Sequence, residues 1–297
     1  MIAAKPPRVR RKRSRDEVVA RASGTALTVL VWIGALACIF PLAWALVSSF
    51  RGGQSFLVSP FNVDPRELTL GNYATVFSND SFSTGFKNST IQVAIILATT
   101  LFFCPLAGYG FAKFKFRGQN VLFSVMVLTL FFVPITQYIP LLIEMNTIGW
   151  VDTYQSLVMP LVISSFGIFW MSGVIKAIPD DLLHAARVEG CGHFGVWWRV
   201  IMPIIKPALV SLAVVSFLNA YNDYLWPLLI LPSPTMQTIQ IALSQLATNV
   251  ASNAYTTTGA WGPVLAGSVV VFLPTVVIFL AMQRYFIRGV LQGSVKE

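Results

Sequence analysis

Residues 178–209 read IPDDLLHAARVEGCGHFGVWWRVIMPIIKPAL and lie between two apolar runs without being apolar or fully polar themselves. Pro179 suits the first turn of a helix, where its missing N–H costs nothing. The two aspartates that follow place negative charge at the positive end of the helix dipole. Gly190 can adopt the left-handed conformation that ends a helix, and residues 194–201 carry an apolar stripe at helical spacing. The stretch therefore predicts two short helices around a glycine turn, a shape that fits a groove on another protein.

The composition of the whole chain indicates a membrane protein. Of its 297 residues 55% are apolar and only 11% are charged, whereas soluble domains carry about a quarter charged residues. A membrane-spanning helix needs about 20 apolar residues. The sequence predicts six such spans, at Thr25–Val47, Ser89–Phe111, Val121–Ile143, Gln155–Ile175, Ala208–Leu231 and Val264–Phe286.

The basic residues predict the orientation of these spans. Eight of the 21 Lys and Arg residues lie within residues 1–23, which favours a cytosolic anchor beside anionic lipid over a nucleic-acid-binding arm. With the N-terminus in the cytosol, eighteen of the 21 fall on the inner side. The chain is thus divided into a basic cytoplasmic tail (1–23), a six-span transmembrane domain (24–287) containing the inner loop 178–207, and a cytoplasmic C-terminal tail (288–297).

Glycines and prolines inside the spans predict packing and bends. Small residues allow two membrane helices to approach closely. Prolines are tolerated in membrane helices where neighbouring groups compensate the freed carbonyls. The third span holds Pro134 and Pro140 and is expected to be kinked, either lining a cavity or simply bent. Close helix packing is expected at Gly108, Gly110, Gly167 and Gly173.

The fifth predicted span carries a polar stripe. Ser216, Asn219, Asp223 and Trp226 are spaced by three, four and three residues, which places them on one face of a continuous helix. An ionised group at the bilayer centre costs at least about 2.5 kcal/mol, so the carboxylate should face a cavity, a partner or the bundle interior. An aromatic ring with hydrogen-bonding neighbours suits a sugar site. The other interpretation is that Asn222 and Asp223 bond a neighbouring helix, and both remain open.

The 178–209 stretch resembles the cytoplasmic loop of permease subunits in binding-protein-dependent ABC importers. The motif of that family reads roughly E-A-A, three residues, G, nine residues and I-x-L-P. The chain matches it with Ala185-Ala186, Glu189-Gly190 and Ile201-Met202-Pro203, and it has His184 at the acidic position. LTLGNYATVF at 68–77 and Asn222-Asp223-x-Leu225-Trp226-Pro227 also resemble family segments, so the resemblance covers nearly the whole chain.

The resemblance points to the carbohydrate-uptake branch, the smaller subunit of maltose-permease type. It implies an all-α membrane protein with six transmembrane helices, the type I ABC importer permease fold and a cytoplasmic coupling-helix loop. It also implies a bacterial or archaeal inner membrane, a second permease forming a heterodimer, two cytosolic ATPases and an extracytoplasmic solute-binding protein. The residues expected to couple to the ATPases are His184, Ala185, Ala186, Glu189, Gly190, Phe194, Trp197, Trp198 and Pro203.

In that scheme closure of the ATPase pair pushes on the loop, and the flanking helices rock the cavity between two access states. Phe194, Trp197 and Trp198 would anchor the loop as buried aromatic residues do at interfaces. The chain has no G-x-x-x-x-G-K-[ST] phosphate loop, so ATP and Mg²⁺ should be used by the partner subunits. No catalytic residue or cofactor is expected, because the chain shows no nucleophile–base pair or metal motif. His184, Glu189, Cys191 and His193 are close in sequence, but a helix–glycine–helix between them does not bring four zinc ligands together.

Two other classes of function are possible. A secondary transporter could use Asp223 as an intramembrane proton or ion relay, although the chain has no inverted repeat. A membrane enzyme could use Asp180 and Asp181 on a phosphate substrate, but it would need further acidic clusters at the same membrane face. The transported solute itself is not encoded in any of these motifs.

Overall fold

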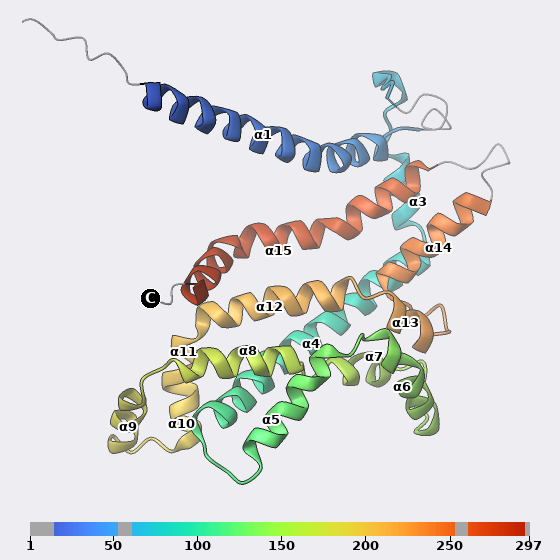
Figure 1. Cartoon of the computed structure of the whole chain (residues 1–297). Coiled ribbons are helices and arrows are strands. Elements are labelled where there is room, and N and C mark those ends of the chain that lie inside the picture. Colours follow the sequence, from blue (N-terminus) through green and yellow to red (C-terminus); the bar gives the residue numbers. More distant parts are fainter. Residues whose placement is uncertain (1–14, 53–60, 253–260, 295–297) are drawn as a thin grey trace, which may run out of the picture.

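The computed structural model describes residues 15–52, 61–252 and 261–294, with side chains for 27–52, 61–252 and 261–283. These residues are almost entirely helical, and within them the only strand-like pairing is an isolated bridge between Arg51 and Leu68. In Figure 1, α15, α12 and α8 run in the same general direction, with α9 and α10 at one end and α13 at the other. The helices are α1 (Arg15–Ser49), α3 (Gly71–Phe77), α4 (Asp80–Lys113), α5 (Gln119–Leu128), α6 (Ile135–Thr147), α7 (Tyr154–Val158), α8 (Ser165–Lys176), α9 (Asp180–Val188), α10 (His193–Val196), α11 (Met202–Ile204), α12 (Lys206–Tyr221), α13 (Leu225–Ile230), α14 (Ile239–Ser252) and α15 (Gly262–Ser294).

Four of the helical segments are long and apolar enough to cross a membrane, and the number rises to six if each of two bent helix pairs is one span. The membrane class expected from composition is therefore confirmed. The outer boundaries differ from those predicted. Helix α1 begins at Arg15, inside the predicted basic tail, and α15 continues to Ser294 through the predicted C-terminal tail. Residues 1–14 and 295–297 of those tails lie outside the described residues.

The third predicted span is broken at its first proline. Helix α5 runs into a 3₁₀ turn, Thr129–Phe131, and α6 begins after Pro134 at 109° to that axis. Phe132 is extended and ends the 3₁₀ turn, and Val133, the residue before Pro134, lies outside both helices, as expected because a residue before a proline is disfavoured in helical conformation. Pro140 lies inside α6 without ending it. The kink expected in the third span is thus a complete break at Pro134, whereas Pro140 does not interrupt the helix.

The fifth predicted span is not one helix, and the prediction that its polar stripe shares one face is wrong. Helix α12 ends at Tyr221, where the Asn222 side-chain amide donates to the Leu218 carbonyl at 2.9 Å. The carboxylate of the following residue, Asp223, accepts hydrogen bonds from the backbone N–H groups of Leu225 and Trp226, the first two residues of α13. Asn and Asp side chains compete with the helix for backbone groups in this way. The Asn222 side chain therefore bonds the end of α12, and the Asp223 side chain bonds the start of α13.

Helix α4 extends through both hydrophobic clusters of the bundle. At the α13 end its Val93 and Ile96 pack in a cluster with residues of α12, α13, α14 and α15. At the α9 end Cys104 and Tyr109 pack in a second cluster with residues of α8 and of the 178–207 loop. The 34 residues of α4 thus link the two ends of the molecule in one element.

Two of the four glycines predicted to allow close packing do so, at the contact of α4 with α8. A Cβ atom on Gly108 would lie 2.9 Å from both the Met171 Cβ and the Ser172 nitrogen of α8, and one on Gly167 would lie 2.8 Å from the Cys104 Sγ. Gly110 and Gly173 have no heavy atom within 4 Å of the same position. The close approach therefore depends on one glycine from each helix.

A Gly108→Ala variant should lower the stability of the bundle. Its added methyl group meets backbone of α8, which cannot move aside as a flexible side chain could, and overpacking of this kind costs about 1–3 kcal/mol. Gly110→Ala is the matched control, since it adds the same methyl group to the same helix in open space. Thermal denaturation of the detergent-solubilised protein should show a lower midpoint for the first variant only. Equal midpoints would contradict the close contact.

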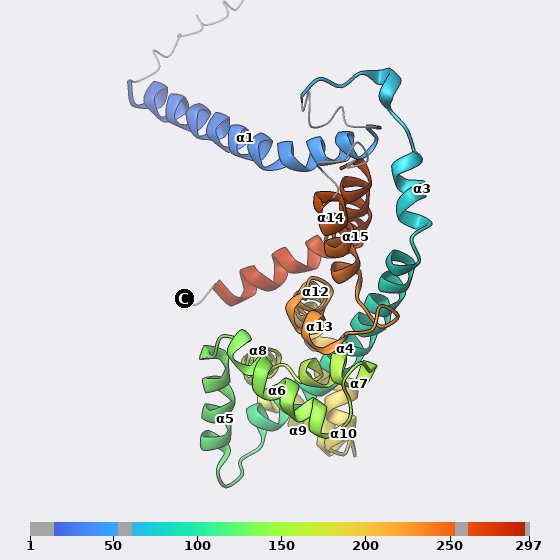
Figure 2. The same cartoon turned by 90° about the vertical axis from the view of Figure 1, so that its right-hand side faces the viewer.

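Helix α1 lies apart from the bundle along most of its length. None of the residues in its apolar window is buried, and Figures 1 and 2 both show it approaching the other helices only at its C-terminal end. There the Asn72 side-chain amide donates to the carbonyls of Ser49 and Arg51 at 2.8 Å each, and the Ser49 hydroxyl bonds that of Tyr73. The helix is therefore attached at one end and exposed along the rest.

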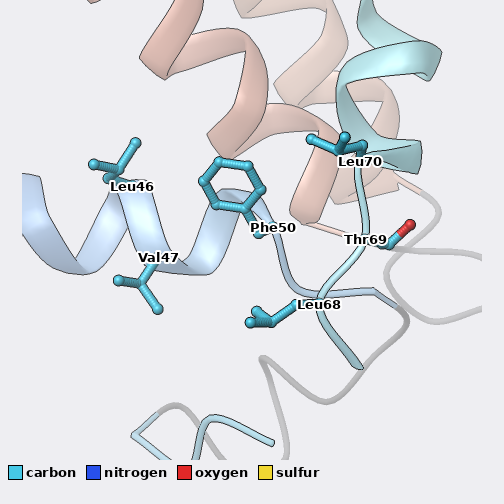
Figure 3. A pocket seen from close by; sticks show the side chains of 6 residues that line it. All are labelled: Leu46, Val47, Phe50, Leu68, Thr69 and Leu70. Atoms are coloured by element: carbon cyan, nitrogen blue, oxygen red, sulfur yellow. The ribbon is translucent and has the colours of Figure 1, made fainter. Parts of the chain in front are cut away.

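A cavity of about 380 Å³ lies beside this attachment. Figure 3 shows its lining side chains, which come from the end of α1 and from the segment before α3. They carry one hydroxyl group and no charge, which does not fit a site for a polar solute. The lining residues are Leu46, Val47, Phe50, Leu68, Thr69 and Leu70.

Candidate functional site

The 178–207 loop, called the elbow from here on, has the predicted helix–glycine–helix form. Helix α9 ends in a turn where Gly190 has φ of 88° and the N–H of Cys191 donates to the Ala186 carbonyl at 3.0 Å. This is the Schellman type of helix end, which glycine favours because it has no Cβ. Leu183 and Ala186 are buried and hold the inner face of α9 against the elbow-end cluster. The prediction of this local geometry is confirmed.

The opposite face of α9 is exposed and partly apolar. Leu182 is 49% exposed and Val188 is 89% exposed, with exposed Ala185 between them at a spacing of three residues from each. His184 and Glu189 are exposed on the same short helix and its cap. Leu182 and Val188 were not among the residues predicted from the motif, although their spacing with Ala185 is visible in the sequence. This face is the surface of the elbow that a partner protein can contact.

The three aromatic residues of the second limb do not share one role. Trp197 is fully buried, and its ring lies edge-on to Phe102 of α4 at 5.4 Å. Phe194 is 59% exposed and Trp198 is 54% exposed. The expected anchoring of a partner by all three is therefore corrected: Trp197 holds the elbow to α4, and only the other two have free surface. Trp197 and Ile201, the first and last residues of the π-helical turn Trp197–Ile201, are both buried, whereas the adjacent Trp198 is exposed.

The other residues predicted to couple to the ATPases differ in their burial. Ala186 points into the core, whereas Gly190 and Pro203 are exposed. The turn from this limb into α12 is sharp, because the axis of residues 193–204 lies at 80° to that of α12. The elbow is therefore a sharp corner with exposed side chains on both limbs.

Lys113 also joins the elbow to the end of α4, although from the sequence it is only one of the basic residues on the predicted inner side. The Lys113 ammonium donates to the Ile178 carbonyl and to the Asp180 carboxylate, the latter at 2.8 Å. Through this hydrogen bond and its charge, Lys113 holds the pKa of the exposed Asp180 carboxyl below its usual value. No pattern in the sequence could pair residues 67 positions apart.

The residues of the predicted substrate path are separated by the break between α12 and α13. Asn219 and Asn222 are exposed, whereas Ser216 is buried within α12. Trp226 is 2% exposed, its Nε1–H donates to the Ser156 carbonyl at 3.1 Å, and its ring contacts that of Tyr138. The tryptophan therefore packs α13 against α7 and α6. Among the described residues no three His, Cys, Asp or Glu side chains come together as a metal site requires.

Comparison with known proteins agrees with this architecture. Residues 105–292 match the family described as binding-protein-dependent transport system inner membrane component. An arabinooligosaccharides transport system permease protein, AraQ of Bacillus subtilis, is 33% identical over 91% of this chain and 95% of its own length. The lactose transport system permease protein LacG of Rhizobium radiobacter is 31% identical over 89% of this chain and 93% of its own.

The fold is also that of a solved transporter. A chain of a bacterial ABC transporter involved in the import of the acidic polysaccharide alginate superposes with a TM-score of 0.78. It has 23% sequence identity and covers 93% of this chain and 99% of its own. The elbow with its adjoining helices lies entirely inside the segment that matches the family. The chain therefore belongs to the family of inner membrane components of binding-protein-dependent transport systems.

Proposed function

We propose that the chain is the permease subunit of an ATP-driven, binding-protein-dependent importer of disaccharides, oligosaccharides or related solutes. The single observation that carries the proposal is 33% identity over nine-tenths of the chain to a permease named for arabinooligosaccharides, AraQ of B. subtilis. LacG of R. radiobacter, a second relative, is named for a disaccharide, lactose. Aromatic and amide side chains suit such solutes, and the exposed Asn219 and Asn222 are the candidates for the solute path.

In the proposed assembly the chain crosses the inner membrane six times, with both termini in the cytosol. The support for this orientation is the excess of Lys and Arg in the segments that would lie inside. A second permease completes the pore, two cytosolic ATPases bind the elbows, and an extracytoplasmic binding protein delivers the solute. ATP and Mg²⁺ are used by the ATPases, because the chain has no phosphate-binding loop of its own.

The elbow supplies the mechanical connection. A partner that holds the exposed face of α9 moves a rigid corner, because Gly190 and the buried Trp197 fix the angle between its limbs. Helices α8 and α12 continue directly from that corner into the bundle. Closure of the ATPase pair would therefore tilt both helices and change access to the space between the two permeases.

Uptake of sugar by cells that carry the complete importer should depend on ATP and not on the proton gradient. A panel of radiolabelled arabinotriose, lactose and maltose is supplied to these cells. We expect depletion of ATP to stop the uptake of the accepted sugar, and a protonophore with ATP held constant to leave it unchanged. The reverse pattern would favour the secondary transporter that uses Asp223. Uptake of none of the three sugars would contradict the proposed substrate class.

A further inference from the structure

One lysine at the end of α4 holds both sides of the link between α8 and α9. Lys113 is the last residue of α4, and its ammonium donates to the Ile178 carbonyl and to the Asp180 carboxylate. Ile178 follows the end of α8, and Asp180 is the first residue of α9. Within the described parts of the chain this is the only salt bridge. Its geometry fixes the start of the elbow relative to a helix more than 60 residues away.

The second limb of the elbow rests on the same helix. The ring of Phe114, directly after Lys113, lies 5.1 Å from the ring of His193 at the start of α10. One limb is thus bonded to the end of α4, and the other is packed against it. Further back along α4, Phe102 contacts Trp197 of the same limb. Helix α4 is joined to the elbow by side chains alone, whereas α8 and α12 are joined to it by the backbone.

We propose that Lys113 is a positioning residue that transmits movement of the elbow to α4 during the transport cycle. This inference rests on the proposed function, since it needs an ATPase that moves the elbow. A push on α9 reaches α8 and α12 through the chain. It reaches α4 through the packing of α4 against α8 and the elbow, and the bonds of Lys113 are the polar part of that connection at the end of α4. Helix α4 also continues into the opposite hydrophobic cluster. Its displacement therefore carries the movement to the far end of the bundle.

The burial of the two partners shows why this bond can be tested without unfolding the protein. The Lys113 side chain is 7% exposed, whereas that of Asp180 is 68% exposed. Removal of the ammonium leaves the Asp180 carboxylate facing solvent, so no buried charge is left unpaired. Loss of the ammonium should therefore loosen the start of α9 relative to α4 while the elbow keeps its glycine turn and its exposed face.

The chain offers matched controls for each partner. Lys115 is two residues away and exposed, so Lys115→Gln removes the same charge from the same loop without touching the elbow bond. Asp181 is exposed beside Asp180 in the first turn of α9, so Asp181→Asn is the control for Asp180→Asn. Lys113→Arg keeps a cationic donor at the end of α4 and is the conservative variant.

The experiment uses the complete importer, purified in nanodiscs with its second permease and both ATPases. Two quantities are measured: the amount of ATPase that copurifies, and MgATP hydrolysis with and without the binding protein of the system. Mutations of residues in coupling networks typically change coupling by roughly twofold to thirtyfold. We expect Lys113→Gln to keep ATPase association and basal hydrolysis and to lose stimulation by the binding protein by about that factor. Asp180→Asn should show a smaller loss, since the bond to Ile178 remains, and Lys113→Arg and both controls should behave as wild type.

Each result supports or overturns the inference. Full stimulation in Lys113→Gln overturns it, and so does an equal loss in Lys115→Gln, which would indicate a general effect of charge. Loss of ATPase association in Lys113→Gln would also overturn it, because the lysine would then shape the docking surface and not transmit its movement. If the wild-type chain binds no ATPase at all, the proposed function fails as well. A wild-type complex with an unaffected Lys113→Gln variant overturns the inference alone.

Discussion

Replacing Gly190 by proline is expected to leave the chain inserted in the membrane and to abolish both ATPase association and sugar uptake. Gly190 has φ of 88°, and its N–H donates to the Arg187 carbonyl at 3.0 Å. Proline fixes φ near −65° and has no N–H, so it can satisfy neither requirement. The turn between α9 and α10 would open, and the exposed face of α9 would no longer be held at a fixed angle to α12.

A second glycine in the same turn provides a control for the left-handed conformation of Gly190. Gly192 lies two residues away with φ of −67°, and neither glycine has a heavy atom within 4 Å of a built Cβ. Gly192→Ala should therefore behave as wild type. Gly190→Ala should be intermediate, because a left-handed alanine costs about 1–2 kcal/mol. The measurements are copurification of the ATPase, uptake by cells and membrane insertion by surface labelling. Normal uptake by the Gly190→Pro variant would exclude the elbow as the coupling element.

The two neighbouring tryptophans should give opposite phenotypes when each is replaced by alanine. Trp197 is fully buried, and loss of a buried aromatic side chain costs about 3–5 kcal/mol. Trp198 is 54% exposed, and surface substitutions usually change stability by less than about 0.5 kcal/mol. We expect Trp197→Ala to lower the thermal midpoint strongly. We expect Trp198→Ala to keep that midpoint and to weaken ATPase association.

A third variant separates packing from hydrogen bonding at the buried position. The Nε1–H of Trp197 has no hydrogen-bond partner among the described residues. Trp197→Phe removes this unpaired donor while it keeps an aromatic ring against Phe102, so it should lose much less stability than Trp197→Ala. Thermal unfolding followed by circular dichroism compares the three variants with wild type. A Trp198→Ala midpoint as low as that of Trp197→Ala would show that the assigned burial is wrong.

The sequence predicted those parts of the structure that local chemistry determines. Gly190 acts on its immediate neighbours, and the helix–glycine–helix form of the elbow is as expected. The apolar runs likewise identified a membrane protein, and the motif at residues 185–203 identified its family. Small side chains predicted close packing at Gly108 and Gly167, but also at Gly110 and Gly173, where no neighbour lies within 4 Å.

The remaining differences come from contacts that no local pattern contains. The spacing of Ser216, Asn219 and Asp223 is that of a helix face, but the side chain of Asn222 bonds the backbone and ends the helix between them. Trp197 and Trp198 are equally apolar, and the packing of this limb against Phe102 of α4 decides that Trp197 is the buried one. The bond from Lys113 to Asp180 joins residues whose proximity depends on the packing of α4 against α8. The roles of these residues therefore depend on tertiary contacts, which residue type and local spacing do not reveal.

The attachment of α1 at a single end has a consequence for the biogenesis of the protein. Because the residues of its apolar window make no buried contact within the described chain, no later part of this chain is needed to cover that surface. The helix can enter the bilayer while the remaining residues are still being synthesised, and its single attachment leaves it free to adjust its tilt to bilayers of different thickness. The bonds from Asn72 and Tyr73 to Ser49 and Arg51, together with the contact of α1 with α15, then join it to the rest of the nascent chain.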